Sequence, residues 1–136
     1  MKVTWPSGRL VVGSYLSVAS MACGSVTGSK SAEFTIAVDS ITGPTAVSGG
    51  GAFESRLWGV VGPSGCYRFK ELRTTRVPAQ IDVTVIGELM SGVACTQVFV
   101  TLGGVTLRVE PIIPNDFRIV VHQPNGSTLV RRIAGE

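Results

Sequence analysis

Residues 117–133 read FRIVVHQPNGSTLVRRI, and this stretch decides the fold class. Apolar residues recur at every second position from Phe117 to Val121, which is the period of a half-buried β-strand. Pro124-Asn125-Gly126 interrupts the pattern, and a glycine after asparagine supplies the positive φ that a tight hairpin needs. A second strand pattern follows at 128–133. The stretch therefore predicts two antiparallel strands joined by a hairpin.

The same alternation recurs along most of the chain after Glu33. Gly103-Gly104 separates two such patterns and predicts a second hairpin. Pro111 to Asn115 contains two prolines that cannot donate ladder hydrogen bonds, so it predicts an edge or a crossing between sheets. We expect seven or eight strands, spaced as in an all-β sandwich. The other strand patterns cover 34–38, 57–61, 66–74, 81–85, 98–102 and 105–109.

The composition fits one packed domain. Hydrophobic residues make up 44% of the 136 residues and charged residues 15%, whereas a disordered chain shows the reverse balance. The net charge is +3, but Lys2 and Arg9 precede Cys23 in the segment that we expect to be removed. The rest carries ten basic and nine acidic residues, a net charge of about +1 that gives no reason to expect nucleic acid as a partner.

The N-terminal segment has the layout of a secretory signal. Met1 to Arg9 is short and basic, and Leu10 to Ala22 is an uncharged run of small and apolar residues. This run is too short to cross a membrane, because a stable spanning helix needs roughly 20 residues. It matches the apolar region of a signal peptide, with small residues at Ser20 and Ala22 before the cleaved bond. The alternative is a buried first strand or helix, with Cys23 as an ordinary core residue.

The run Ser20-Met21-Ala22-Cys23 resembles the cleavage site of bacterial lipoprotein precursors. In that family a cysteine directly follows the cleaved bond and carries a lipid on its thiol. The position three residues before the cysteine is usually leucine, and here it is Ser20. The resemblance implies lipidation of Cys23 and hence a membrane anchor. Cleavage at the same bond without lipidation is the other outcome of an export signal.

The lipoprotein resemblance also implies a domain layout and a location. It gives a signal peptide over 1–22, a small and polar flexible tether over 23–32, and the β domain over 33–136. Gly24 stands where the family uses aspartate to retain proteins at the inner membrane. We therefore expect an outer-membrane lipoprotein facing the periplasm or, without the lipid, a periplasmic or secreted protein.

Cys66 and Cys95 are the even pair that remains once Cys23 is set aside. An exported compartment permits disulfides, and two cysteines have only one connectivity. Each cysteine follows a turn-like stretch and opens a strand pattern, so we expect a bridge between strand ends and not at the centre of the sandwich. Two reduced thiols in a cytosolic protein are the alternative.

The strand patterns and the cysteine pair together resemble the immunoglobulin-like antiparallel β-sandwiches of bacterial envelope proteins. The likeness covers about 34–133 and implies architecture alone. The antibody-type order of cysteine, tryptophan and cysteine is absent, because Trp58 precedes Cys66. No functional residue is transferred from the resemblance.

A search for catalytic or metal-binding patterns finds no site. His122 is the only histidine; Asp116 is near it in sequence, but no serine has the context of a nucleophile elbow. One histidine and no paired cysteine motif give no zinc site, and the aspartates have no calcium-loop spacing. We expect a protein that is not an enzyme, with no catalytic residue, no metal and no cofactor.

Two features have both a binding and a structural interpretation. Arg68, Lys70, Arg73 and Arg76 form the densest basic cluster, either a contact face for an acidic partner or a solvated strand face with edge protection by charge. Trp58 is either an exposed platform that contacts a partner or stacks on a sugar, or a core side chain.

The leading functional hypothesis is a non-enzymatic cell-envelope module with a structural or protein-interaction role. Its partner would be an envelope protein. The alternative is a carbohydrate- or ligand-binding sandwich, which needs Trp58, Tyr67 or Phe99 exposed beside polar groups in a concave surface. An enzyme inhibitor ranks lower and would use Pro111 to Asn115 as a protruding loop.

Overall fold

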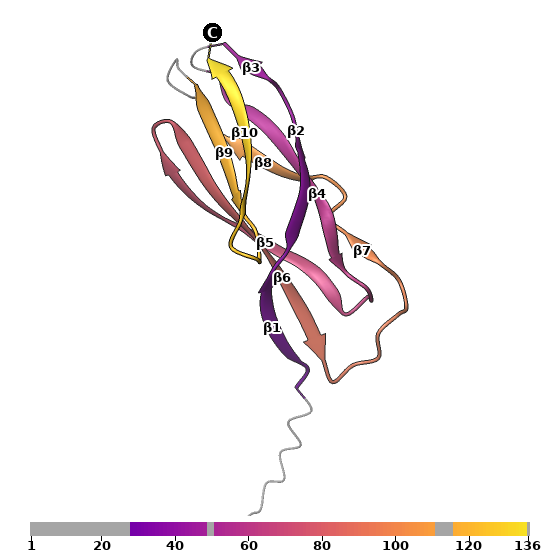
Figure 1. Cartoon of the computed structure of the whole chain (residues 1–136). Helices are drawn as coiled ribbons and strands as arrows, with labels where there is room; N and C mark the ends of the chain where they lie inside the picture. Colours follow the sequence, from indigo (N-terminus) through magenta and orange to yellow (C-terminus); the bar gives the residue numbers. More distant parts are fainter. Residues whose placement is uncertain (1–27, 49–50, 111–115, 136) are drawn as a thin grey trace, which may run out of the picture.

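The computed structural model describes residues 28–48, 51–110 and 116–135, which form an all-β sandwich of two sheets (Figure 1). These residues contain no helix. The strands are β1 (Lys30–Thr35), β2 (Ala37–Thr42), β3 (Ala46–Val47), β4 (Phe53–Gly62), β5 (Tyr67–Val77), β6 (Gln80–Ser91), β7 (Val100–Thr101), β8 (Val105–Val109), β9 (Phe117–His122) and β10 (Thr128–Gly135).

The smaller sheet is built around β4. β2 pairs antiparallel with one side of β4, and β7 and then β8 pair with the other side. Gly103 and Gly104 lie between β7 and β8 with φ of +61° and +81°. The hairpin predicted at these two glycines is wrong, because β7 and β8 run in the same direction along the same partner. The glycines bend the chain without reversing it.

The larger sheet is built around β6. β5 pairs with one side of β6, while β1 and β9 share its other side. β9 pairs with β10, and β3 pairs with the end of β10. The β6–β9 and β10–β3 pairs are parallel, so this sheet is mixed and not purely antiparallel as predicted. A parallel pair needs a long crossover, and the chain between β6 and β9 passes through the smaller sheet.

The hairpin predicted from Pro124-Asn125-Gly126 is confirmed. Gln123 N–H donates to the Ser127 carbonyl at 2.9 Å, and Gly126 has φ of +83°. A second tight hairpin, between β5 and β6, turns at Pro78-Ala79. This turn has no glycine and no positive φ, which fits a type I turn with proline at its second position.

The chain changes sheets at Ile36, between β1 and β2. Ile36 is buried, and its N–H donates to the Val85 carbonyl at 2.8 Å. β1 begins at Lys30, so residues 30–32, assigned to the tether from the sequence, belong to the larger sheet. Their side chains are small or polar and exposed, so no alternation marked them as a strand.

Alternate residues of both sheets meet in one core between the layers. The rings of Phe53 and Phe117 meet edge to face across it, with centroids 6.2 Å apart. The core comprises Ile36, Val38, Ile41, Phe53, Leu57, Val61, Ile81, Val83, Val85, Leu102, Leu107, Val109, Phe117, Ile119, Val121 and Ile133.

Candidate functional site

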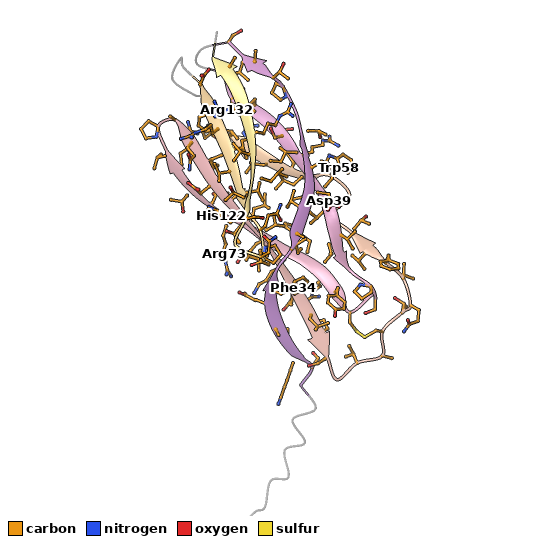
Figure 2. The ribbon with its side chains drawn as sticks, viewed as in Figure 1. Phe34, Asp39, Trp58, Arg73, His122 and Arg132 are labelled. Carbon is orange, nitrogen blue, oxygen red and sulfur yellow. A yellow bond between two sulfur atoms is a disulfide. The ribbon has the colours of Figure 1, made fainter. Side chains whose placement is uncertain are left out.

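A groove runs along one open side of the sandwich, between β2 of the smaller sheet and, in the larger sheet, the turn from β9 to β10 and β10 itself. Figure 2 labels Asp39 on β2 and Arg132 on β10. Two hollows, of about 620 Å³ and about 420 Å³, lie in succession between these segments, and we call them together the β2–β10 groove. The lining is Ala37, Val38, Gln123, Pro124, Asn125 and Ser127 in the first hollow, and Asp39, Ser40, Ile41, Thr45, Leu129, Val130, Arg131 and Arg132 in the second.

The side-chain amide of Gln123 closes one end of the groove. Its Oε1 accepts a hydrogen bond from Val38 N–H at 3.0 Å, and its Nε2 donates to the Val38 carbonyl at 2.7 Å. The amide therefore pairs with β2 as a neighbouring peptide unit would. Both outward-facing backbone groups of Val38 are satisfied by this one side chain.

Arg131 closes the other end. Its Nη1 donates to the carbonyl of Ile41 at 3.1 Å, and its Nη2 donates to the carbonyls of Gly43 and Pro44. Arg131 stands between Leu129 and Ile133 on the inward-facing side of β10, where a charged group needs partners of this kind. Together with Gln123 it occupies backbone groups on the outer edge of β2.

The outer edge of β10 is paired at one end by another strand, whereas side chains pair with the outer edge of β2. Ala134 N–H donates to the Thr45 carbonyl at 2.9 Å, and β3 pairs in parallel with residues 134 and 135. Backbone groups alternate from side to side along a strand, so those of Val130 and Arg132 point the same way as those of Ala134, toward the groove. Within the described residues β3 pairs only with the end of this edge, and β2 with its connection to β3 lies across the groove from the rest.

The sequence reasoning missed Gln123, Val130 and Arg131 as site residues. One signal was available for Arg131: it shares the parity of the apolar residues Leu129 and Ile133, so an alternating strand places it inward. No comparable signal marks Gln123, whose role depends on a contact with β2, 85 positions earlier in the chain.

The basic cluster on β5 is largely paired with acids. Arg73 Nη2 lies 2.9 Å from Glu33 and 2.7 Å from Glu71, and Lys70 also pairs with Glu33. Hydrogen bonds from Lys70 and Arg73 hold the pKa of the Glu33 carboxyl below its ordinary value. The same contacts with Glu33 raise the pKa of Lys70 and of Arg73.

The two outer members of the cluster also have partners. Arg68 lies 2.6 Å from Glu88, and hydrogen bonds from Ser31 and Arg68 lower the pKa of the Glu88 carboxyl. The guanidinium carbon of Arg76 lies 4.6 Å from the ring centroid of Phe117. These contacts favour the interpretation of the cluster as a solvated, internally paired strand face over a site for an acidic partner.

Trp58 lies on the outer side of β4 and is 37% exposed, so it is not a core side chain (Figure 2). Its indole N–H donates to Thr42 Oγ1 at 2.8 Å. Its ring covers Gly104 so closely that a Cβ there would lie 2.9 Å from it. Tyr67 packs against the core, whereas Phe99 is exposed. Neither hollow of the groove has an aromatic lining residue, so the groove gives no support to a sugar-stacking interpretation.

His122 lies on the outer face of the larger sheet and pairs with Asp82. Its Nε2 is 2.8 Å from Asp82 Oδ1, on the neighbouring strand β6. Hydrogen bonds from Gln80 and then His122 lower the pKa of the Asp82 carboxyl. The pair joins two parallel strands on an exposed surface, and the sequence neighbour Asp116 is not its partner in this contact.

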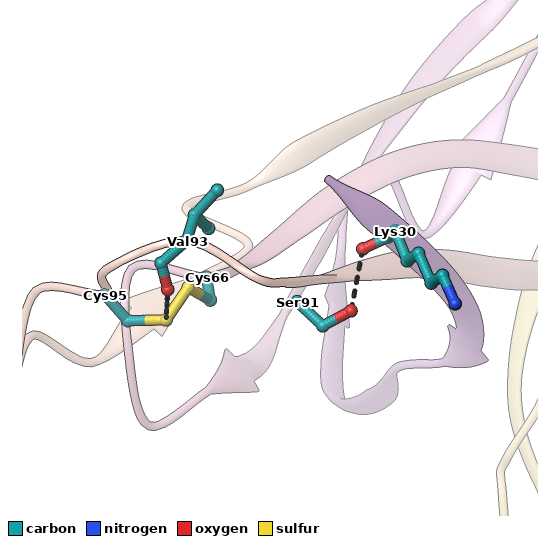
Figure 3. The surroundings of a disulfide bond; sticks show 5 residues. All are labelled: Lys30, Cys66, Ser91, Val93 and Cys95. Atoms are coloured by element: carbon teal, nitrogen blue, oxygen red, sulfur yellow. Dashed lines mark hydrogen bonds between the residues drawn. A yellow bond between two sulfur atoms is a disulfide. The ribbon is translucent and has the colours of Figure 1, made fainter. Parts of the chain in front are cut away.

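Cys66 and Cys95 form the predicted disulfide, with Cα atoms 5.2 Å apart (Figure 3). Cys66 directly precedes β5, as expected. Cys95 lies in the loop between β6 and β7 and does not open a strand, because β7 begins only at Val100. The bond therefore joins two loops at the end of the sandwich and not the centre of its core.

Other expectations fall outside the described residues: the signal peptide over 1–22, the lipidation site Cys23 and the loop from Pro111 to Asn115. Across the described ranges no helix is long and apolar enough to cross a membrane. The same part of the chain holds no group of three or more histidine, cysteine or acidic side chains placed to bind a metal.

Comparison of the chain with protein-family models, curated proteins and solved structures found no significant match. No residue role is therefore taken from a relative.

Proposed function

We propose that this chain is a non-enzymatic lipoprotein of the cell envelope, anchored through Cys23, whose sandwich binds an extended segment of a partner protein. The cleavage-site resemblance at Ser20-Met21-Ala22-Cys23 supports the anchor. The disulfide supports an oxidising, exported compartment, because cytosolic thiols are kept reduced. Gly24 supports the outer membrane as the destination.

The observation that carries the binding role is the part of the β10 edge before Ala134, with which no strand of the described ranges pairs. Proteins commonly recognise extended peptides by adding a strand to such an edge, where backbone hydrogen bonds give affinity and side-chain pockets give specificity. β3 already pairs with the end of this edge in parallel. A partner segment would pair along Val130 and Arg132, beside the Gly43–Pro44 connection that leads into β3, with the hollows of the groove next to it.

Site-specific photocrosslinking in intact bacteria tests the proposal. A photoreactive amino acid replaces Val130, which borders the groove and is 47% exposed. In the control it replaces Val77, which has the same exposure and lies at the hairpin between β5 and β6. We expect one crosslinked partner from position 130 and none from position 77. The crosslink should disappear with Arg132→Pro, because proline removes a groove-facing N–H and leaves the β9 ladder intact.

The same bands from both positions, or a band that persists in Arg132→Pro, would contradict partner binding at this edge. A crosslinked species of twice the mass of the chain would replace the proposal with self-association. Thermal unfolding of Arg132→Pro serves as the control, since a folded variant should keep a transition close to that of the parent.

A further inference from the structure

Exposed apolar side chains concentrate in one short loop of the described chain. Seven large hydrophobic residues are exposed, and three of them lie between β6 and β7: Val93 at 48%, Val98 at 59% and Phe99 at 73%. We call Gly92–Phe99 the 92–99 loop. It contains no charged residue. Several large apolar side chains exposed on one short loop are a feature of protein and membrane contact sites.

The 92–99 loop is held in place at its centre. The disulfide fixes Cys95 to Cys66, and Gly65 N–H donates to the Thr96 carbonyl at 2.9 Å. Gly65 and Thr96 are so close that a Cβ on Gly65 would lie 2.1 Å from Thr96 Oγ1. Val93 on one side of this clamp and Phe99 on the other are therefore presented by a fixed backbone.

The chain enters the domain beside this loop. Lys30, the first residue of β1, pairs with Ser91, the last residue of β6, and Ser91 Oγ donates to the Lys30 carbonyl at 3.1 Å (Figure 3). Gly92 follows at once. Cys23 precedes Lys30 by seven residues, which reach at most about 25 Å when fully extended. A lipid on Cys23 thus places this end of the sandwich near the bilayer.

We propose that the 92–99 loop rests on the lipid bilayer and inserts Val98 and Phe99 between the headgroups, an inference that depends on the Cys23 anchor proposed above. An uncharged apolar loop gains by burial at the boundary of headgroups and acyl chains, where no charge has to be desolvated. The exposed Lys30 beside it suits anionic headgroups. The contact would orient the sandwich and direct the far end of β6 away from the membrane.

Depth-dependent fluorescence quenching tests the contact. The full chain is expressed in bacteria, purified from membranes and reconstituted in phosphatidylethanolamine–phosphatidylglycerol vesicles, with or without brominated acyl chains. In a Trp58→Phe background, Phe99→Trp reports the loop. Val77→Trp is the matched control, since Val77 is 47% exposed at the other end of β6, roughly 36 Å away. Intact mass and thermal unfolding of each variant establish lipidation and folding.

We expect a blue-shifted emission from position 99 that brominated lipids quench strongly, and little quenching at position 77. Equal quenching at both positions in a lipidated protein would overturn the loop contact and leave the anchor standing. A blue shift without quenching would overturn it in favour of a protein or a second copy covering the loop. An intact mass without lipid would overturn the anchor and the loop contact together.

Discussion

Different interactions join the two sheets along the two sides of the sandwich. On the side of β5 and β7 the chain crosses between the sheets twice, and the Cys66–Cys95 disulfide ties the crossings together. On the side of β2 and β10 the chain also crosses, at Ile36 and between β2 and β3, but there the side chains of Gln123 and Arg131 join the sheets by hydrogen bonds to the backbone of β2. The disulfide side presents the 92–99 loop to the surroundings. The side of β2 and β10 keeps a groove and the edge of β10. The larger contribution to stability and the proposed partner-binding edge are therefore expected on opposite sides of the sandwich.

Removal of the disulfide should have the largest effect on stability. The bond spans 29 positions, and the chain-entropy model gives about 3.5 kcal/mol for a loop of that size. The double variant Cys66→Ser/Cys95→Ser should lower the free energy of unfolding by about that amount in urea denaturation. Reductant should do the same to the parent chain and nothing to the variant. A loss smaller than that of Arg131→Met would mean that the disulfide side is not the stronger one.

Substitution of Arg131 should have the second largest effect on stability. Arg131→Met keeps much of the buried stem and removes the hydrogen bonds to the carbonyls of Ile41, Gly43 and Pro44. Charged hydrogen bonds of this kind contribute about 2 kcal/mol, so the variant should unfold at lower urea concentration. Arg132→Met, at the exposed neighbouring position, should change stability by less than about 0.5 kcal/mol. Equal losses of unfolding free energy in the two variants would show that the hydrogen bonds of Arg131 do not hold β10 to β2.

Gln123→Glu should lower the free energy of unfolding by a smaller amount, about 1 kcal/mol. At neutral pH its carboxylate still accepts from Val38 N–H but cannot donate to the Val38 carbonyl. Hydrogen exchange followed by mass spectrometry should become faster over residues 37–42. Gln97→Glu, in the loop on the opposite side, should leave β2 exchange unchanged, and faster exchange in both variants would argue against a local role for Gln123.

The smallest effect concerns the charged outer face of the larger sheet. The pKa values of Glu33, Asp82 and Glu88 lie below their ordinary values in the folded chain. Groups with a lowered folded pKa contribute stability above the unfolded pKa, near 4.5 for glutamate, and lose it as the pH falls through the folded pKa. The melting temperature should therefore fall on acidification below about pH 4.5, and Glu33→Gln should flatten part of that decline. A pH-independent melting temperature would contradict the pairing.

Strand positions were predictable where one face of a strand is buried and the other is solvated. β6 and β9 show this directly, because the core residues recur at every second position: Ile81, Val83 and Val85 in β6, and Phe117, Ile119 and Val121 in β9. In β5 a bulge between Phe69 and Glu71 shifts the register, so Phe69 and Leu72 both pack toward the core although they are three positions apart. That shift has no sequence signal of its own.

Strand partners were much harder to predict than strand positions. The patterns on either side of Gly103-Gly104 looked like the two arms of a hairpin, but both pair with β4, a contact that alternation does not encode. The groove was hidden for the same reason, since it forms where β2 meets β10 after a separation of some 90 positions. The disulfide could be predicted from the sequence because two cysteines allow only one pairing.

The intact mass of the protein isolated from bacterial membranes, measured with and without reductant, tests the anchor and the disulfide together. We expect a chain that begins at Cys23, carries diacylglycerol and an acyl chain, and gains two hydrogen atoms on reduction of the Cys66–Cys95 bond. A mass that retains residues 1–22 and shows free thiols would contradict export, anchor and disulfide together.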